Sequence, residues 1–390
     1  MPSPIYLDNN ATTPLDPRVL EAMLPVFREH FGNPASQTHS YGWYADELVE
    51  IAREQVASLI GAQTEEIVFT SGATESNNLA IQGVARANMQ GRADLSQCSF
   101  ISVATEHRAI LDPLEHLAKQ GASVLILDVD SEGNLDSDSY HNATDHKTCL
   151  STVMLANNEI GVIHDVATLA TFKRKDTHFF HCDATQAAGK IPVDVAQLGV
   201  DLLSLSAHKL YGPKGVGALY IRRGISTESL SALQLGGNHE QGFRSGTLNV
   251  AGIVGFGKAC ELAQNELDAD STKMDLLAKQ LLQQISNKVS GIELNGNTRN
   301  RIPGNLNIAI EGTDSVRLIG LLQTKLALSA SSACQSASKI PSHVLAALGL
   351  PIQRQRSSIR IGIGRFTTEE EVECAGEILV GAIEKIRVGR

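Results

Sequence analysis

Hydrophobic positions near the start of the chain follow a helical period. Tyr44, Leu48, Ile51, Val56 and Leu59 recur at steps of three to five residues, which places them close to one face of a helix. The pattern predicts helices over residues 18–30 and 39–60.

From residue 67 onward, short apolar runs alternate with helical stretches. Each run has four to seven residues rich in Val, Ile, Leu or Phe, as buried strands do. The runs are 67–70, 100–104, 123–129, 152–156, 179–183, 202–206 and 216–221. They predict an α/β fold with a mostly parallel seven-stranded sheet, covered by helices on both faces. Ligands of such folds bind where strands end and helices begin.

The second half of the chain predicts a separate, smaller α+β domain. A long helix is expected over 249–289, and the alternation restarts near residue 302. The elements expected there are strands at 305–310 and 359–363 and helices at 314–323, 341–348 and 368–388. We predict a large domain of residues 15–262 and a small domain of residues 1–14 and 263–390, with the N-terminal arm packed onto the small domain.

Charge and composition exclude several classes of protein. The 390 residues carry 33 Lys and Arg against 43 Asp and Glu, a net charge of −10. The longest basic cluster is three residues, so direct nucleic-acid binding is not expected. No apolar stretch is long enough to predict a membrane span, and the N-terminus lacks a targeting pattern, which predicts a cytoplasmic protein.

The six cysteines do not form a close pair. They are Cys98, Cys149, Cys182, Cys260, Cys334 and Cys374. Their spacing fits neither a metal site nor a disulfide framework, so the default for each is a reduced, buried thiol.

Two charged residues end adjacent apolar runs. Lys209 follows the run 202–206; it either reaches solvent, as most lysines do, or serves as an amine that condenses with an aldehyde cofactor. Asp183 ends the run before it, 26 residues earlier, where it could cap a helix or keep a pyridine nitrogen protonated. The pair is more informative than either residue alone.

Other segments remain open between structural and functional interpretations. A helix that opens near Ala73 and Thr74 offers backbone N–H groups to an anion, or is an ordinary corner with Thr74 as its cap. The polar segments 105–107, 157–161 and 244–247 are open in the same way.

A small-residue segment surrounds Cys334. Residues 327–341 hold four Ala, five Ser and one Cys. The cysteine is either incidental or a nucleophile presented by a mobile loop. Downstream, Arg360 lies in a strand-like run, where its charge needs a structural carboxylate or a substrate carboxylate as its partner.

Eight blocks carry a resemblance across essentially the whole chain. They are FGNPAS (31–36), FTSGATESNNLAI (69–81), ATEHRAI (104–110), NNEIG (157–161), DATQAAGK (183–190), SAHKLYGPKGVGALY (206–220), GGNHEQGFRSGTLNV (236–250) and ASSACQSAS (330–338). The chain resembles the cysteine desulfurases of the NifS and IscS type, in the class V aminotransferase family. These are fold-type I enzymes of pyridoxal phosphate (PLP), with the aspartate aminotransferase-like fold. The segment 330–338 departs from many relatives, which have a Gly before Ser-Ala-Cys.

The resemblance implies a set of cofactor ligands. Lys209 would bind PLP covalently and later move protons, Asp183 would pair with the pyridine nitrogen, and Gln186 would bond the ring hydroxyl. His107 would stack on the ring. The implied phosphate ligands are Ala73, Thr74, Ser206 and His208, with Thr247 contributed by the second subunit of a homodimer.

The resemblance also implies how the substrate, L-cysteine, is handled. Arg360 would bind its carboxylate, with Asn33 nearby and Asn158 beside the ring. Cys334 would attack its sulfur, leaving alanine and an enzyme persulfide. The sulfur would pass to acceptor proteins, such as an iron–sulfur scaffold, or to tRNA thiolation.

Two other functions remain as alternatives. One is a PLP-dependent lyase, such as a cystine or selenocysteine lyase, that cleaves a C–S or C–Se bond and releases the chalcogen. The other is an inactive scaffold that only binds partners. Cys334 argues against the lyase, and the combination of Lys209, Asp183, His107 and Cys334 argues against the scaffold.

Overall fold

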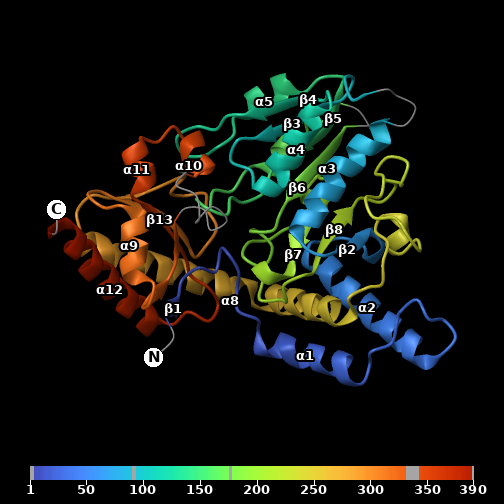
Figure 1. Cartoon of the computed structure of the whole chain (residues 1–390), viewed down its shortest axis with the longest axis horizontal. Helices are drawn as coiled ribbons and strands as arrows, with labels where there is room; N and C mark the ends of the chain where they lie inside the picture. The colour runs from blue at the N-terminus through green and yellow to red at the C-terminus, as the bar shows by residue number, and fades with distance from the viewer. Residues whose placement is uncertain (1–3, 90–93, 175–177, 331–341, 389–390) are drawn as a thin grey trace.

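The computed structural model describes residues 4–89, 94–174, 178–330 and 342–388 and has two lobes (Figure 1). The large lobe contains a seven-stranded sheet in the order β2-β8-β7-β6-β5-β3-β4. The strands are β2 (Ile67–Thr70), β3 (Ser99–Val103), β4 (Ser123–Leu127), β5 (Thr148–Thr152), β6 (Phe179–Asp183), β7 (Leu202–Ser206) and β8 (Gly217–Ile221). Strand β8 is antiparallel to β2 and β7, and the remaining pairs are parallel. The predicted α/β fold is therefore confirmed.

Helices cover both faces of this sheet and bury six of its seven strands, whereas the edge strand β4 is partly exposed. On β6, Phe179 belongs to one core cluster, and Phe180 and Cys182 belong to the other. Successive side chains of a strand point to opposite faces, which explains this division. Helices α3 (Ala73–Met89) and α4 (Arg108–Lys119) cover one face, and α2 (Ser40–Leu59) and the first part of α8 (Val250–Lys288) cover the other; α1 (Pro17–Arg28) packs along α8.

One strand begins earlier than its hydrophobic pattern predicts. The expected strand at 152–156 is instead β5, which ends at Thr152. The backbone N–H groups of Val153 and Leu155 still donate to the carbonyls of His181 and Asp183, at 3.1 and 3.0 Å. The apolar run is therefore the buried exit from the strand, and it leads to the cavity described below.

The small lobe is built on a four-stranded antiparallel sheet in the order β12-β13-β10-β9. Its strands are β9 (Ile292–Leu294), β10 (Asn305–Ile310), β12 (Ser329–Ala330) and β13 (Ser358–Gly362), and its helices are α9 (Ser315–Leu322), α10 (His343–Ala347), α11 (Ile352–Arg356) and α12 (Glu369–Val388). The N-terminal arm reaches this lobe, where β1 (Ile5–Tyr6) pairs in parallel with β11 (Leu326–Ala327). The short α5 (Ser137–Ala143), α6 (Val166–Ala170) and α7 (Val195–Leu198) belong to the large lobe.

Helix α8 joins the two lobes. Ile253, Phe256 and Cys260 lie in the core of the large lobe, whereas Met274 and Leu281 lie in the core of the small lobe. In Figure 1 the helix runs beneath both.

None of the described helices combines the length and the apolar composition that crossing a lipid bilayer requires.

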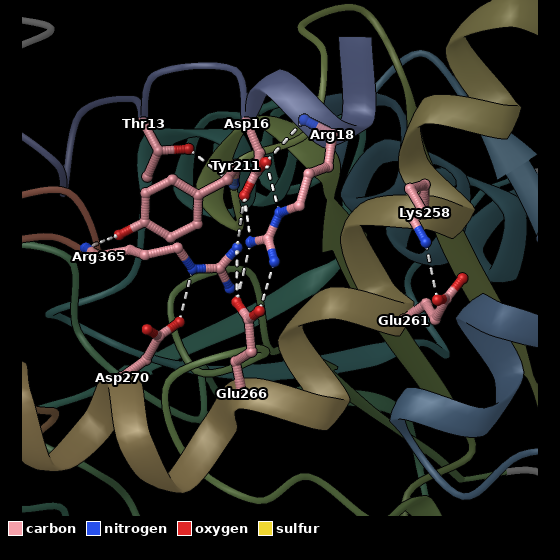
Figure 2. Close-up of polar contacts among 9 residues, drawn as sticks. All are labelled: Thr13, Asp16, Arg18, Tyr211, Lys258, Glu261, Glu266, Asp270 and Arg365. Carbon is pink, nitrogen blue, oxygen red and sulfur yellow. Dashed lines mark hydrogen bonds and ion pairs between the residues drawn. The ribbon is translucent and has the colours of Figure 1, made fainter. Parts of the chain in front are cut away.

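A buried group of charges ties the N-terminal arm to both lobes (Figure 2). Arg365 donates to Asp270 of α8 at 2.6 Å and to Asp16 at 3.0 Å. Burial alone would raise the pKa of Asp16, but hydrogen bonds from Arg18 and Arg365 outweigh it and lower that pKa to about 2. The Arg365 guanidinium also lies 4.5 Å from the centre of the Tyr211 ring.

Tyr211 itself adopts a left-handed backbone conformation, with φ of 66°. This conformation is costly for a residue with a bulky side chain. Its backbone N–H donates to the Thr13 hydroxyl at 2.8 Å, and its own hydroxyl accepts from the backbone N–H of Arg365 at 2.5 Å. These contacts hold the turn that directly follows Lys209.

We expect Arg365→Met to lower the free energy of unfolding by about 3 kcal/mol, because it leaves the buried Asp270 without its partner and Asp16 with Arg18 alone. Lys258→Met is the matched control, since Lys258 pairs with Glu261 on the surface of α8 (Figure 2). An exposed pair of this kind contributes about 0–1 kcal/mol. Urea denaturation at neutral pH measures both. Equal losses in the two variants would show that the buried group does not hold the lobes together.

Candidate functional site

A cavity of about 420 Å³ lies where the carboxyl ends of the parallel strands meet the small lobe. Residues that follow five strands line it, because parallel strands end at one edge of the sheet. From β2 come Ser71 to Glu75, from β3 His107, from β5 Met154 to Glu159, from β6 Asp183 to Gln186, and from β7 Ser206 to Lys209. The small lobe contributes His343 and Arg360, and the N-terminal arm contributes Asn10 and Ala11.

The amine of Lys209 lies in this cavity and is held by the N-terminal arm. Its Nζ donates to the carbonyl oxygens of Asn10 and Ala11, at 2.8 and 2.6 Å. Lys209 belongs to a short helical turn at the end of β7 and does not extend away from the protein, as a solvated lysine would. The amine is therefore oriented by neutral carbonyls and faces a space large enough for a small-molecule ring.

Asp183 lines the same cavity at the end of β6, the strand that pairs with β7. Its two carboxylate oxygens accept hydrogen bonds from the Thr185 backbone N–H at 2.9 Å and from the Asn77 side chain at 2.8 Å. Only 6% of the residue is exposed. These two hydrogen bonds hold the Asp183 carboxylate in a fixed orientation at the wall of the cavity.

One end of the cavity is suited to a phosphate group. Helix α3 begins at Ala73, and the first turn of a helix leaves backbone N–H groups without helical acceptors. Ser206 and Lys214 line the cavity as well, and the Ser206 hydroxyl lies close to Gly72, directly before α3. Burial and the neighbouring Lys209, Lys214 and Lys190 lower the pKa of His208 to about 4, so its imidazole is neutral at pH 7 and can donate one N–H.

Two residues from the segment after β3, Glu106 and His107, lie near Asp183, and His107 lines the cavity. His107 is the N-cap of α4, and its Nδ1 accepts from the Ala109 backbone N–H at 3.1 Å. Burial lowers the pKa of His107, which keeps the ring neutral and suited to stacking. Burial and the nearby Asp183 raise the pKa of Glu106 well above its ordinary value.

Arg360 faces the cavity from β13 of the small lobe. It is 1% exposed, and its guanidinium donates to the carboxylate of Asp8 at 2.9 Å and to the Asn158 carbonyl at 3.1 Å. The buried Nε has no partner among the described residues. A structural carboxylate is thus present, as Asp8, and the guanidinium has more N–H donors than these two contacts use.

Most of the candidate residues from the sequence line this one cavity. They are Ala73, Thr74, His107, Asn158, Asp183, Gln186, Ser206, His208, Lys209 and Arg360. Asn33 and Thr247 are exposed and do not line it, and Cys334 lies outside the described residues. Of the other cysteines, Cys98, Cys149, Cys182 and Cys260 are buried as expected, but Cys374 is exposed on α12, which corrects its assignment as a buried thiol.

Several contacts of the site are not predicted by the hydrophobic pattern of the sequence. Asn77 lies one turn after Ala73 and Thr74 on α3, so helical spacing from the anion site could have identified it. Asp8, Asn10 and Ala11 belong to an arm without periodicity, and the sequence carries no signal for their contacts.

The residues fit PLP on the observations above. Lys209 supplies an amine for the aldehyde, Asp183 a carboxylate for the pyridine nitrogen, and the start of α3 N–H donors for the phosphate. Arg360 lines the same cavity, and its guanidinium is a suitable partner for a substrate carboxylate beside them. The chemistry of each donor matches a different part of the cofactor or its substrate.

Comparisons with known proteins agree with this site. The family described as Aminotransferase class-V matches residues 5–374. The chain is 48% identical over 387 residues to "Cysteine desulfurase IscS" of Anaeromyxobacter sp. (strain Fw109-5), covering 99% of this chain and 94% of that protein. It is 45% identical to the protein of the same name from Rickettsia felis, covering 98% and 92%.

Solved structures give the same answer. A "NifS-like protein" aligns with a TM-score of 0.88 and 36% identity, covering 97% of this chain and 98% of the other. A structure titled "SspA in complex with cysteine" aligns with a TM-score of 0.80 and 33% identity, covering 93% and 99%. The chain belongs to the class-V aminotransferase family and, within it, to the PLP-dependent cysteine desulfurases.

Proposed function

We propose that this enzyme removes sulfur from L-cysteine, leaves L-alanine, and carries the sulfur as a persulfide on Cys334. The observation that carries the proposal is the convergence of Lys209, Asp183 and Arg360 in one cavity. When bound, PLP withdraws electrons from the α-carbon of its substrate and makes the α-proton removable. The protein supplies position and charge.

Each charged residue has a separate task in this proposal. Asp183 faces the pyridine nitrogen and favours its protonated form, while Gln186 bonds the ring oxygen. Arg360 binds the substrate carboxylate beside Asn158. Lys209 anchors the cofactor and, when released, moves a proton at its Nζ between the α-carbon and neighbouring positions.

The phosphate ligands proposed are Ala73, Thr74, Ser206 and His208 from one subunit. His107 stacks on the ring, a role that suits a neutral imidazole because a cation there would oppose protonation of the pyridine nitrogen.

Sulfur transfer is assigned to Cys334. Its thiolate attacks the substrate sulfur, an S–S bond forms, and the C–S bond breaks. The electron pair of that bond stays with the β-carbon and takes up a proton, which completes alanine. The persulfide is then available to acceptors such as an iron–sulfur scaffold protein or a tRNA-thiolation system.

We further propose a homodimer in which Thr247 serves the partner's cavity. Thr247 is exposed and does not line the cavity of its own chain. Asn33, predicted near Arg360 and the substrate, is also exposed and outside that cavity, and its substrate role stays a prediction. A row of exposed apolar side chains on α1, α2 and their connection supports a covered face, since patches of this kind mark interfaces. They are Leu20, Leu24, Phe27, Phe31, Tyr41, Trp43, Tyr44 and Ile51.

We also propose the division into a large domain of residues 15–262 and a small domain of residues 1–14 and 263–390. Support comes from α8, whose buried apolar side chains belong to the core of the large lobe up to Ala263 and to the core of the small lobe from Met274.

The cytoplasm is the proposed location.

Lys209→Ala should abolish turnover and the visible absorption of the bound cofactor, because no other amine in the proposal forms the covalent link. Borohydride reduction followed by peptide mapping measures the link directly. Lys258→Met serves as the control and should keep both properties. A borohydride-stable label on the Lys209→Ala protein would contradict the assignment.

Cys334→Ala should keep the cofactor and bind cysteine but lose alanine release by at least about 100-fold, since the thiolate is the proposed sulfur acceptor. Cys374→Ala is the matched control, because Cys374 is an exposed thiol far along the chain on α12. It should retain wild-type turnover. Near-normal alanine release by the Cys334→Ala protein would instead favour a lyase, which needs no protein thiol.

Mixed dimers test the shared site. Thr247→Asp should be nearly inactive because its carboxylate would repel the partner's phosphate, and Lys209→Ala is inactive for its own reason. Random mixing of the two variants should restore about a quarter of wild-type activity, since half the dimers hold one intact site. Lack of recovery in confirmed mixed dimers, or an active monomer in sedimentation, would contradict the proposal.

A further inference from the structure

A second lysine lies directly behind the cofactor site. Lys190 is 7% exposed, and its Nζ donates to the side-chain carbonyl of Gln186 at 2.9 Å. No carboxylate forms an ion pair with Lys190 in the described part of the chain. A buried ammonium with only a neutral acceptor is costly, so its position needs a separate explanation.

The hydrogen bond from Lys190 fixes which way the Gln186 amide faces. The Gln186 oxygen accepts from Lys190, and the Gln186 NH₂ group donates to the Asn10 carbonyl at 2.9 Å. Turning the amide over would place two donors against each other at Lys190 and two acceptors at Asn10. Both neighbours therefore favour the orientation in which Gln186 offers N–H groups, and not oxygen, on the side of Asn10 and the cavity.

The charges around Lys190 are themselves positive. Burial, Lys209 and Arg360 lower its pKa to about 7, and Lys190 in turn helps to lower the pKa of His208. Such a site favours the ammonium form only when an anion lies close by. The oxygen on the ring of PLP is such an anion, and in the proposed function it lies against Gln186.

We infer that Lys190 is a positioning residue that acts through Gln186: it holds the amide as a donor to the anionic ring oxygen of the cofactor and places a positive charge behind it. The inference rests on the proposed placement of the ring. Its consequence is electrostatic, because a positive charge near the cofactor disfavours the protonated form of the link to Lys209. That proton is therefore lost at a lower pH than it would be without Lys190.

The test is a pH titration of the visible absorption of the purified holoenzyme, without substrate. Lys190→Met should raise the midpoint by about one to two pH units, the effect of one charge several ångströms away in a partly screened site. Lys190→Arg keeps the charge and should stay within about 0.3 units of wild type. Lys258→Met should not move the midpoint at all.

A double-mutant cycle shows whether the effect passes through Gln186. In a Gln186→Leu background, Lys190→Met should shift the midpoint by less than half as much as in the wild type, because coupled residues are not additive. An unchanged midpoint in a folded, cofactor-loaded Lys190→Met protein overturns the inference, as does an equal shift in both backgrounds. If Lys190→Met does not fold, the midpoint of Lys190→Gln decides in the same way. A wild-type protein without visible absorption would instead mean that the proposed function has failed.

Discussion

The geometry of the site depends on the contact between Lys209 and the N-terminal arm. The arm crosses from the small lobe to the large one, and its Asn10 and Ala11 carbonyls accept hydrogen bonds from the Lys209 amine. The same arm bonds His208 through Thr12, Tyr211 through Thr13, and Arg365 through Asp16. A short irregular segment thus fixes the end of β7, the turn after it, and the joint between the lobes.

The balance of charge in the cavity explains how one site can serve several steps. Lys209 and Arg360 both disfavour the charge of Lys190, whereas Asp183 lines the same cavity from β6. Histidines near this group remain neutral because burial and neighbouring cations lower their pKa values. A ligand with a phosphate, an anionic ring oxygen and a carboxylate reduces the repulsion among the cationic side chains. In the proposed function, its pyridine nitrogen lies against the Asp183 carboxylate. Binding of such a ligand is therefore favoured over the unliganded cavity.

The sequence predicts the large lobe well because its buried strands are short apolar runs. The apolar runs 179–183 and 202–206 coincide with β6 and β7, so the pattern alone places Asp183 and Lys209 at or just beyond the ends of buried strands. The pattern failed at β5, where Thr148 and Cys149 lack an apolar signature and the following apolar run leaves the sheet. Hydrophobic periodicity reports burial, and a buried exit segment has the same composition as a strand.

Contacts between distant segments were beyond prediction from periodicity. Asp8 meets Arg360 across 352 positions of sequence, and Gln186 meets Asn10 across 176. Such pairs depend on how the lobes close on each other. In the sequence, Lys190 is only the last residue of the block 183–190, and nothing in the pattern predicts a role for it. The structure shows that it lies four residues after Gln186 and donates a hydrogen bond to it.

The central claim is that sulfur moves from cysteine to one particular thiol, and a single-turnover mass measurement tests it most directly. Holoenzyme mixed with less than one equivalent of L-cysteine should yield one alanine for each sulfur atom gained by the peptide that contains Cys334. Reducing agent should remove that sulfur, and the peptides containing Cys98, Cys149, Cys182, Cys260 and Cys374 should not change. Alanine without added mass at Cys334, or free sulfide in its place from the first turnover, would contradict the account.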